Sequence, residues 1–145
     1  MLDVYKGIKN VQKKQIEIEI HDTSGDEHLG VNRKVQYKDA DVFMICVAAN
    51  SHDSLENVVR WKTEIQEIEQ EKPVALILTK SDLAEGGELD EPVEFSMVKN
   101  KQKEMGFSMS AKTSSKAWED FNVHKAFNRA LTAAYKFKYE EMEDD

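Results

Sequence analysis

Alternating apolar and polar residues near the start of the chain predict a β-hairpin. Between Gln15 and His21, isoleucines alternate with glutamates, which puts one face of a strand in a core and the other in solvent. A second extended run covers Leu2 to Lys9, and the polar residues Gln12 to Lys14 separate the two runs. We therefore expect two antiparallel strands joined by a short turn.

Continuous apolar runs further along the chain predict strands of another kind. Val42 to Ala48 and Val74 to Leu78 show no alternation, which is typical of parallel strands covered on both faces. Phe107 to Ser110 predicts a further short strand.

In the stretches between these strands, apolar residues recur at helical spacing, which predicts helices. Ser51 or Asp53 can cap a first helix. Pro92 suits the first turn of a second helix, which Gly106 would end. Strands separated by helices predict an α/β fold with a mostly parallel sheet and helices on both faces. The apolar positions are Leu55, Val58, Val59, Ile65 and Ile68 in the first helix, and Ala126, Phe127, Ala130, Leu131, Ala134 and Tyr135 in a long last helix.

Length and charge narrow the class of protein. The chain has 145 residues, of which 40% are hydrophobic, and this suits one domain, which we place at residues 1–139. We expect residues 140–145 to form a solvated acidic tail. The formal net charge of −8 repels nucleic-acid phosphates and anionic membrane surfaces, so neither is expected as a partner.

Cysteine content and hydropathy indicate the compartment. The single Cys46 lies inside an apolar run and is expected to be a buried thiol in a reducing environment. No apolar stretch reaches the roughly 20 residues that a membrane span requires. The first residues lack the apolar core of a secretory signal. We therefore expect a cytoplasmic protein.

Three short motifs each follow a predicted strand. The Asp of Asp22-Thr-Ser-Gly25 can hold a magnesium shell, and its Gly lets a backbone N–H approach a terminal phosphate. Thr79-Lys-Ser-Asp82 places a carboxylate at the sheet edge where α/β ligands bind, and there it can accept hydrogen bonds from the ring N–H and amino group of guanine. Ser110-Ala-Lys112 is expected at the same edge.

Together these motifs resemble those of the Ras-superfamily small GTPases. Asp22-Thr-Ser-Gly25 is similar to the second-switch motif Asp-Thr-Ala-Gly, Thr79-Lys-Ser-Asp82 to the guanine motif Asn/Thr-Lys-x-Asp, and Ser110-Ala-Lys112 to the Ser-Ala-Lys loop. Ser54 to Trp61 and Asn122 to Phe127 resemble segments of Rab proteins. The spacing of the last two motifs is similar to that of Ras and Rab proteins and leaves no room for the extra helix of the Rho group.

The resemblance implies a role for each motif residue, and GTP or GDP with magnesium as cofactors. Asp82 would read guanine, while Lys80 and Lys112 would sandwich the base. Ala111 would offer its backbone N–H to the guanine oxygen, and Thr79 and Ser110 would brace the loops. Asp22 would reach magnesium through water, and Gly25 would approach the terminal phosphate.

Several departures from the family pattern bear on catalysis. No Gly-x-x-x-x-Gly-Lys-Ser/Thr phosphate loop occurs in the sequence. Alignment to the family places Met1 just after the first switch, so we expect an incomplete Ras-like three-layer fold (the P-loop GTPase fold) without its first strand and first helix. Asp26 replaces the glutamine that positions the attacking water, so no catalytic residue is expected. No cysteine for a prenyl anchor lies near the C-terminus.

An insertion precedes the last helix. Six extra residues, Lys116 to Phe121, separate the Ser-Ala-Lys motif from that helix and include Trp118 and Phe121. These aromatic residues either pack against the neighbouring helix or serve as anchors for a protein partner.

Three functions fit this sequence. The first is a degenerate GTPase domain that serves as a structural or scaffold subunit of a cytoskeletal or other large assembly. The second is a conventional GTP-binding small GTPase whose N-terminal part is missing from this sequence, and the third is a weak guanine-nucleotide sensor. A missing first strand would leave a gap between Gln15–His21 and Val42–Ala48. Either the sheet closes up or a partner chain supplies a strand, and we expect the partner.

Overall fold

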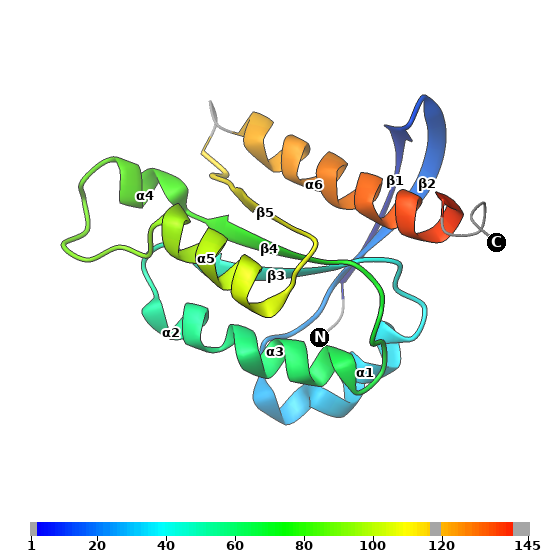
Figure 1. The fold of residues 1–145 in the computed structure, drawn as a ribbon, viewed down its shortest axis with the longest axis horizontal. Helices are drawn as coiled ribbons and strands as arrows, with labels where there is room; N and C mark the ends of the chain where they lie inside the picture. The colour runs from blue at the N-terminus through cyan, green and yellow to red at the C-terminus, as the bar shows by residue number, and fades with distance from the viewer. Residues whose placement is uncertain (1–2, 117–119, 141–145) are drawn as a thin grey trace.

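A computed structural model describes residues 3–116 and 120–140 of the chain (Figure 1). Strands and helices alternate over most of its length. The elements are β1 (Asp3–Val11), β2 (Lys14–Asp22), the 3-10 helix η1 (Glu27–Leu29), α1 (Gly30–Tyr37), β3 (Phe43–Ala48), α2 (His52–Glu56), α3 (Val58–Gln66), β4 (Val74–Thr79), α4 (Ser81–Glu85), α5 (Phe95–Met105), β5 (Met109–Lys112), α6 (Asp120–Tyr135) and the π-helical turn η2 (Lys136–Glu140).

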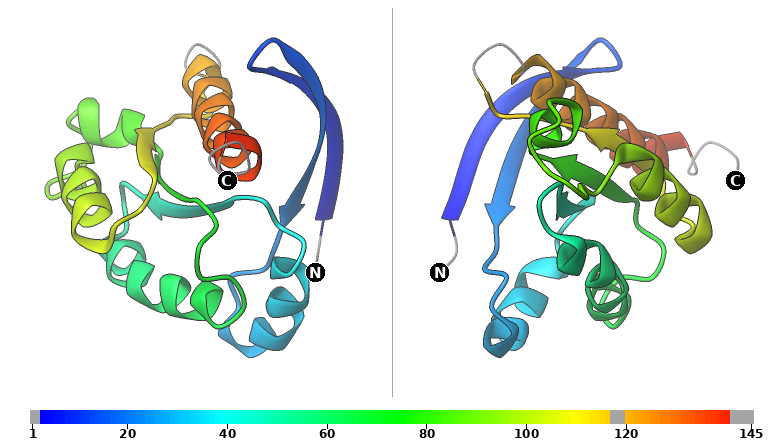
Figure 2. Two further views of the ribbon diagram at one scale, coloured as in Figure 1. Left: turned by 45° about the vertical axis from the view of Figure 1, so that its right-hand side comes forward. Right: turned by 90° about the vertical axis from the view of Figure 1, so that its left-hand side faces the viewer.

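The strands form two separate sheets. β1 and β2 pair as an antiparallel hairpin, whereas β3, β4 and β5 form a parallel sheet with β4 in its centre. The hairpin stands at one side of the molecule, apart from the parallel sheet (Figure 2). The predicted hairpin, the α/β class and the parallel sheet are therefore confirmed.

The hairpin turn uses an unusual backbone. Gln12 and Lys13 both have positive φ angles, 53° and 65°, which is the pattern of the tight turns that match strand twist. The turn brings Val11 opposite Lys14, and it fixes a register in which Gly7 faces Ile18.

Helices cover both faces of the parallel sheet. On one face α2, α3 and α5 enclose the larger core, where Val47, Leu76 and Leu78 are almost fully buried. On the other face Ala126 and Ala130 of α6 pack against a smaller cluster from β4 and β5. The C-terminal ends of β3, β4 and β5 share one edge, because all three strands run in the same direction.

Helix α6 also connects the parallel sheet to the hairpin. Lys9 Nζ of β1 lies 3.2 Å from His124 Nδ1 of α6. At the other end of the helix, the ammonium of Lys14 lies 5.8 Å from the centre of the Tyr135 ring. The hairpin is thus attached to the body mainly through side chains of this helix, and not through strand pairing.

A cavity of about 1580 Å³ lies between the hairpin, β3 and α6. Its walls include Ile16 and Ile18 of β2, Met44 and Cys46 of β3, and Leu131 of α6. The cavity explains why Cys46, expected to be buried, is exposed. Its side chain lies on the wall of β3 that faces this space.

Other predictions were wrong in detail. Pro92 lies before α5, which begins at Phe95 with Glu94 as its N-cap. Val59 is 51% exposed and so is not part of the core face of α3. The last strand begins at Met109, two residues later than expected, because it is placed by pairing with β4. Helix α1 was not predicted at all.

No helix in the described part of the chain is both long enough and apolar enough to cross a bilayer.

Candidate functional site

The loop after β4 carries the first group of candidate residues. Thr79 ends the strand, and its hydroxyl donates to the carbonyl of Val47 in β3 at 3.3 Å. Lys80 follows in the left-handed region with φ 58°, which is uncommon for a residue with a side chain. Ser81 N–H then donates to the carbonyl of Thr113 at 3.0 Å, so the loop after β4 is fixed to the loop after β5.

Asp82 lies in the first turn of α4 and accepts from two side chains. Ser114 Oγ donates to Oδ1 at 2.8 Å, and Lys116 Nζ lies 3.1 Å from Oδ2. The hydrogen bond from Ser114 holds the pKa of the Asp82 carboxyl below its usual value against the opposing effect of burial, and Lys116 adds to the lowering. The carboxylate is therefore ionised at neutral pH and acts only as an acceptor, the state that recognition of a guanine edge requires.

The Ser110-Ala-Lys112 motif lies within β5, although we had expected it to form a loop after that strand. Its residues pair with Leu76, Ile77 and Leu78 of β4. The Ser110 hydroxyl donates to Gln102 Oε1 of α5 at 2.8 Å, and its carbonyl accepts from Arg129 of α6. Ala111 is buried among the residues that pack against α6. Lys112 Nζ lies 2.6 Å from Oε1 of Glu85, the last residue of α4.

Two residues that sequence reasoning missed hold the loop after β5. The Thr113 backbone N–H and hydroxyl both donate to the carbonyl of Leu78, at 2.7 and 3.0 Å. Ser114 is 1% exposed and supplies the hydrogen bond to Asp82. Two adjacent hydroxyl residues directly after the Ser-Ala-Lys motif were the available signal, because buried hydroxyls need partners.

The segment after β2 carries the candidate phosphate and metal residues. Asp22 is the last residue of the strand and lines the cavity beside the hairpin. Gly25 is exposed, and a Cβ placed on it would meet nothing within 4 Å. Within residues 3–116 and 120–140, no group of three or more His, Cys, Asp or Glu residues could hold a metal ion. Mg²⁺ is commonly bound through one or two carboxylates together with waters and substrate phosphates, so Asp22 would serve magnesium only together with such groups.

Asp26 serves as a helix cap in this structure. Its Oδ1 accepts the backbone N–H of His28 at 2.9 Å and so begins the 3-10 helix η1. Its own N–H donates to Ser24 Oγ at 3.1 Å. The side chain at the position of the water-orienting glutamine is therefore directed to the chain's own backbone.

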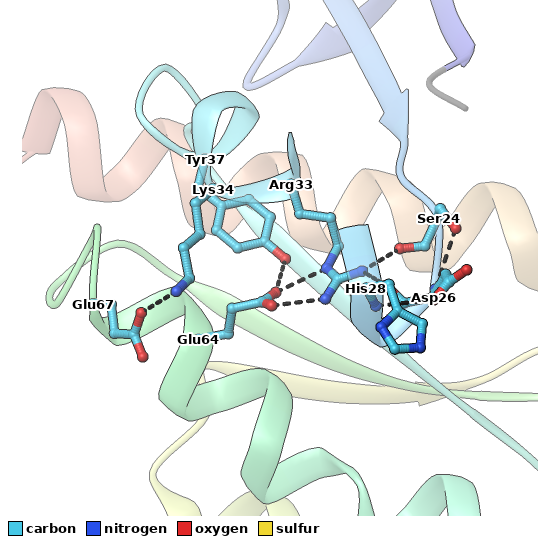
Figure 3. Close-up of polar contacts among 8 residues, drawn as sticks. All are labelled: Ser24, Asp26, His28, Arg33, Lys34, Tyr37, Glu64 and Glu67. Carbon is cyan, nitrogen blue, oxygen red and sulfur yellow. Dashed lines mark hydrogen bonds and ion pairs between the residues drawn. The ribbon is translucent and has the colours of Figure 1, made fainter. Parts of the chain in front are cut away.

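Arg33 of α1 holds this segment against α3 (Figure 3). Its guanidinium donates to the carbonyls of Ser24 and Asp26, and it also makes two hydrogen bonds to Glu64, at 3.0 and 2.8 Å. Tyr37 OH donates to the same carboxylate at 2.6 Å. Arg33 and Tyr37 are buried, and Glu64 is partly buried. We call the three side chains Arg33, Tyr37 and Glu64 the arginine clamp.

The clamp shifts the pKa of each member. Burial favours the neutral form of Glu64, but the hydrogen bonds from Arg33 and Tyr37 outweigh it and lower the pKa of the carboxyl. The hydrogen bond to Glu64 raises the pKa of Arg33. Burial raises the pKa of Tyr37, and its bond to Glu64 adds to this effect. At neutral pH the clamp is therefore an ion pair with a neutral phenol.

Neither aromatic side chain of the insertion is among those that the structure describes. Trp118 lies outside the described residues, and Phe121 lies at the start of α6 with no described side chain. Residues 141–145 of the expected acidic tail also lie outside the described part, while Glu140 is exposed at its edge.

Comparisons with known proteins all indicate the same family. A model of the Ras family matches residues 1–136. The GTP-binding protein RHO4 of Saccharomyces cerevisiae is 32% identical over 117 residues, which cover 80% of this chain and 40% of that protein. The Rho-related GTP-binding protein RhoB of Homo sapiens is 34% identical over 93 residues, 63% of this chain and 45% of RhoB. The chain thus spans less than half the length of these relatives, which are Rho proteins and not the Rab proteins whose segments it resembles.

Proposed function

Since the chain belongs to the Ras family, we propose that it is a small-GTPase-like domain that contacts guanine weakly and works by binding other proteins, not by hydrolysing GTP. The arginine clamp is the observation that carries this proposal. It fixes Ser24 and Asp26, which follow the Asp22 motif, to α3 through a buried ion pair. Hydrolysis by such a domain depends on residues there that orient a water against the terminal phosphate.

The base loops support the part of the proposal that concerns guanine. Asp82 is ionised and braced, and the loops after β4 and β5 are hydrogen-bonded to each other. Lys80 keeps a left-handed backbone, the kind of local strain that clusters at ligand sites. These features favour a site that can still contact the edge of a guanine base.

Simple energetics limit the affinity of that site. Two hydrogen bonds to a charged carboxylate contribute roughly 1.5–3 kcal/mol each. Association costs an estimated 4–15 kcal/mol, and no phosphate loop sequence is present among these 145 residues to offset it. We expect a dissociation constant of about millimolar or weaker, which corresponds to roughly 4 kcal/mol.

Calorimetry with GTP, GDP and ATP on the 145-residue chain tests this function. We expect weak heats that favour guanine nucleotides, that disappear in Asp82→Ala and that persist in the exposed control Asp90→Ala. Phosphate release from GTP should equal that of a protein-free blank. Submicromolar binding of GTP, or phosphate release that Asp82→Ala abolishes, would refute the proposal.

The mass of the natural protein distinguishes our proposal from a conventional GTPase. If that protein carries residues before Met1 that include a phosphate loop, tight GTP binding is expected and our proposal fails. A natural protein with the mass of this chain alone leaves weak binding as the expected result. With its net charge of −8, the domain is better suited to a protein partner in the cytoplasm than to nucleic acid.

A further inference from the structure

The outer strand of the hairpin has a free edge. Within the described residues β1 pairs only with β2, so its other edge has no strand beside it. β1 forms the outer side of the hairpin in both views of Figure 2. Alternate residues of an antiparallel strand direct their backbone N–H and C=O groups outward, so this edge can receive another strand.

Apolar side chains of β1 are exposed as well. Val4, Tyr5 and Ile8 are between 42% and 65% exposed. A Cβ placed on Gly7 would meet only Ile18, at 4.0 Å, so there is open space above this glycine. A strand that pairs with β1 would therefore cover apolar groups as well as backbone.

The sequence of β1 is complementary to itself when two copies run antiparallel. A two-fold axis at Lys6 places each flanking residue opposite one of matching chemistry. The opposite pairs are Asp3 with Lys9, Val4 with Ile8, and Tyr5 with Gly7. Each pair occurs twice, once on either side of the axis, because such an interface is symmetric. Opposite charges and apolar pairs stabilise paired strands, and an aromatic ring can cover an edge glycine.

The neighbouring symmetric registers lack this match. An axis at Gly7 places Lys6 opposite Ile8, and an axis at Tyr5 places it opposite Val4. Both registers bring a charge against an apolar side chain. The axis at Lys6 has one unfavourable contact, between the two copies of Lys6 itself, but this side chain is exposed and its ammonium can turn into solvent.

We propose that two copies of this chain associate through β1, antiparallel about an axis at Lys6, so that their hairpins form one four-stranded sheet. Backbone hydrogen bonds between the two edges give the affinity, and the Asp3–Lys9 pairs fix the register. Lys9 Nζ contacts His124 Nδ1, which does not supply the negative charge of a carboxylate. The dimer is weak, because one strand pair buries less surface than a standard interface and each copy carries a net charge of −8. This self-association goes beyond the proposed function and does not depend on guanine binding.

Sedimentation of the 145-residue chain at concentrations up to about 1 mM tests the proposal, since a small interface is populated only at high concentration. Asp3→Lys and Lys9→Asp each place like charges opposite one another, and we expect each variant alone to associate about tenfold more weakly than the parent. An equal mixture of the two should recover the association of the parent, because opposite charges meet again in the mixed dimer. Lys99→Asp on α5 is the control with the same change of charge, and it should behave as the parent does. A parent that is monomeric throughout, or a mixture no more associated than its components, would overturn the proposal.

A variant on the axis tests the register separately. Lys6→Gln removes the one pair of like charges that this register brings together, and we expect the dissociation constant of the dimer to fall about two- to fivefold. Unchanged or weaker association of Lys6→Gln would overturn the pairing about Lys6. Tight GTP binding in calorimetry would refute the proposed function without changing any of these sedimentation results.

Discussion

Among the charged residues in the described part of the chain, only Arg33 is buried. A buried charge is tolerated when it is paired and hydrogen-bonded. Glu64 provides the opposite charge and accepts two hydrogen bonds from Arg33. The Trp61 ring lies against the same guanidinium, 4.9 Å from ring centre to Cζ. A small set of side chains therefore determines whether the Ser24–Asp26 segment stays attached to α3.

Replacing Glu64 tests how much the clamp contributes. Glu64→Gln keeps the shape but leaves the charge of Arg33 without its counter-ion, and we expect the free energy of unfolding to fall by about 3 kcal/mol. Glu67→Gln is the matched control, because Glu67 is half exposed in its pair with Lys34 and ion pairs at the surface contribute about 1 kcal/mol or less. Urea denaturation measures both. Equal losses in the two variants would contradict the role of the clamp.

The same carboxylate makes stability depend on pH. The pKa of Glu64 is lower in the folded chain than in the unfolded one, where it is about 4.3. Its contribution is therefore complete above that value and is lost as the pH falls through the folded pKa. Between pH 6 and pH 3 we expect the parent to lose more stability than Glu64→Gln. Parallel curves for the two proteins would disprove the linkage.

For single residues, the sequence pattern indicated those that belong to a local motif, but it did not indicate those whose partners are distant in the chain. Asp82 was found because it ends a motif next to a strand. Arg33 escaped notice because Glu64 lies 31 positions away and no local pattern connects the two. Ser114 was likewise missed, since its partner Asp82 lies 32 positions earlier.

Among the elements, those with a clear apolar pattern were predicted and α1 was not. The buried residues of α1 are Arg33 and Tyr37, while its valines Val31 and Val35 are 77% and 60% exposed. Both valines thus face solvent, so the apolar pattern of α1 does not indicate which face of the helix packs on the protein. In β5 the pairing with β4, and not the apolar run from Phe107, decides where the strand begins.

The end of α5 allows a clean test of one element. Gly106 has φ +74° at the C-cap, and a Cβ there would meet nothing within 4 Å, so Gly106→Ala changes only the backbone preference. We expect a loss of roughly 1–2 kcal/mol in the free energy of unfolding. Gly25→Ala is the control, because it also has open space but no positive φ. A change below about 0.5 kcal/mol in both would exclude strain at the cap.

For the molecule as a whole, the class of fold followed from the sequence, but the relation between its sheets did not. Alternating patterns predict which strands exist and which faces they bury. They carry no information on which strands pair across long distances, and the expected gap came from the family resemblance alone. The structure shows that the hairpin and the parallel sheet remain separate.

This division predicts unequal local stability. β4 is paired on both sides and its central residues are buried, whereas most of the hairpin is exposed. Regions with few buried contacts open at lower free energy than the core. Hydrogen exchange read by mass spectrometry should therefore show that Asp3–Asp22 opens well before Val74–Thr79. Simultaneous opening of both regions at all denaturant concentrations would show a single cooperative unit instead.

The contact between β1 and α6 has a consequence for synthesis on the ribosome. Lys9 and His124 are 115 positions apart, so the hairpin is made well before the helix that covers it. At ordinary rates of translation, about 5–20 residues per second, the two are separated by roughly 6 to 23 s. During that interval the nascent hairpin has no helix to pack on. Newly made chains should therefore be held by chaperones through their first strands, and release should wait until α6 has emerged.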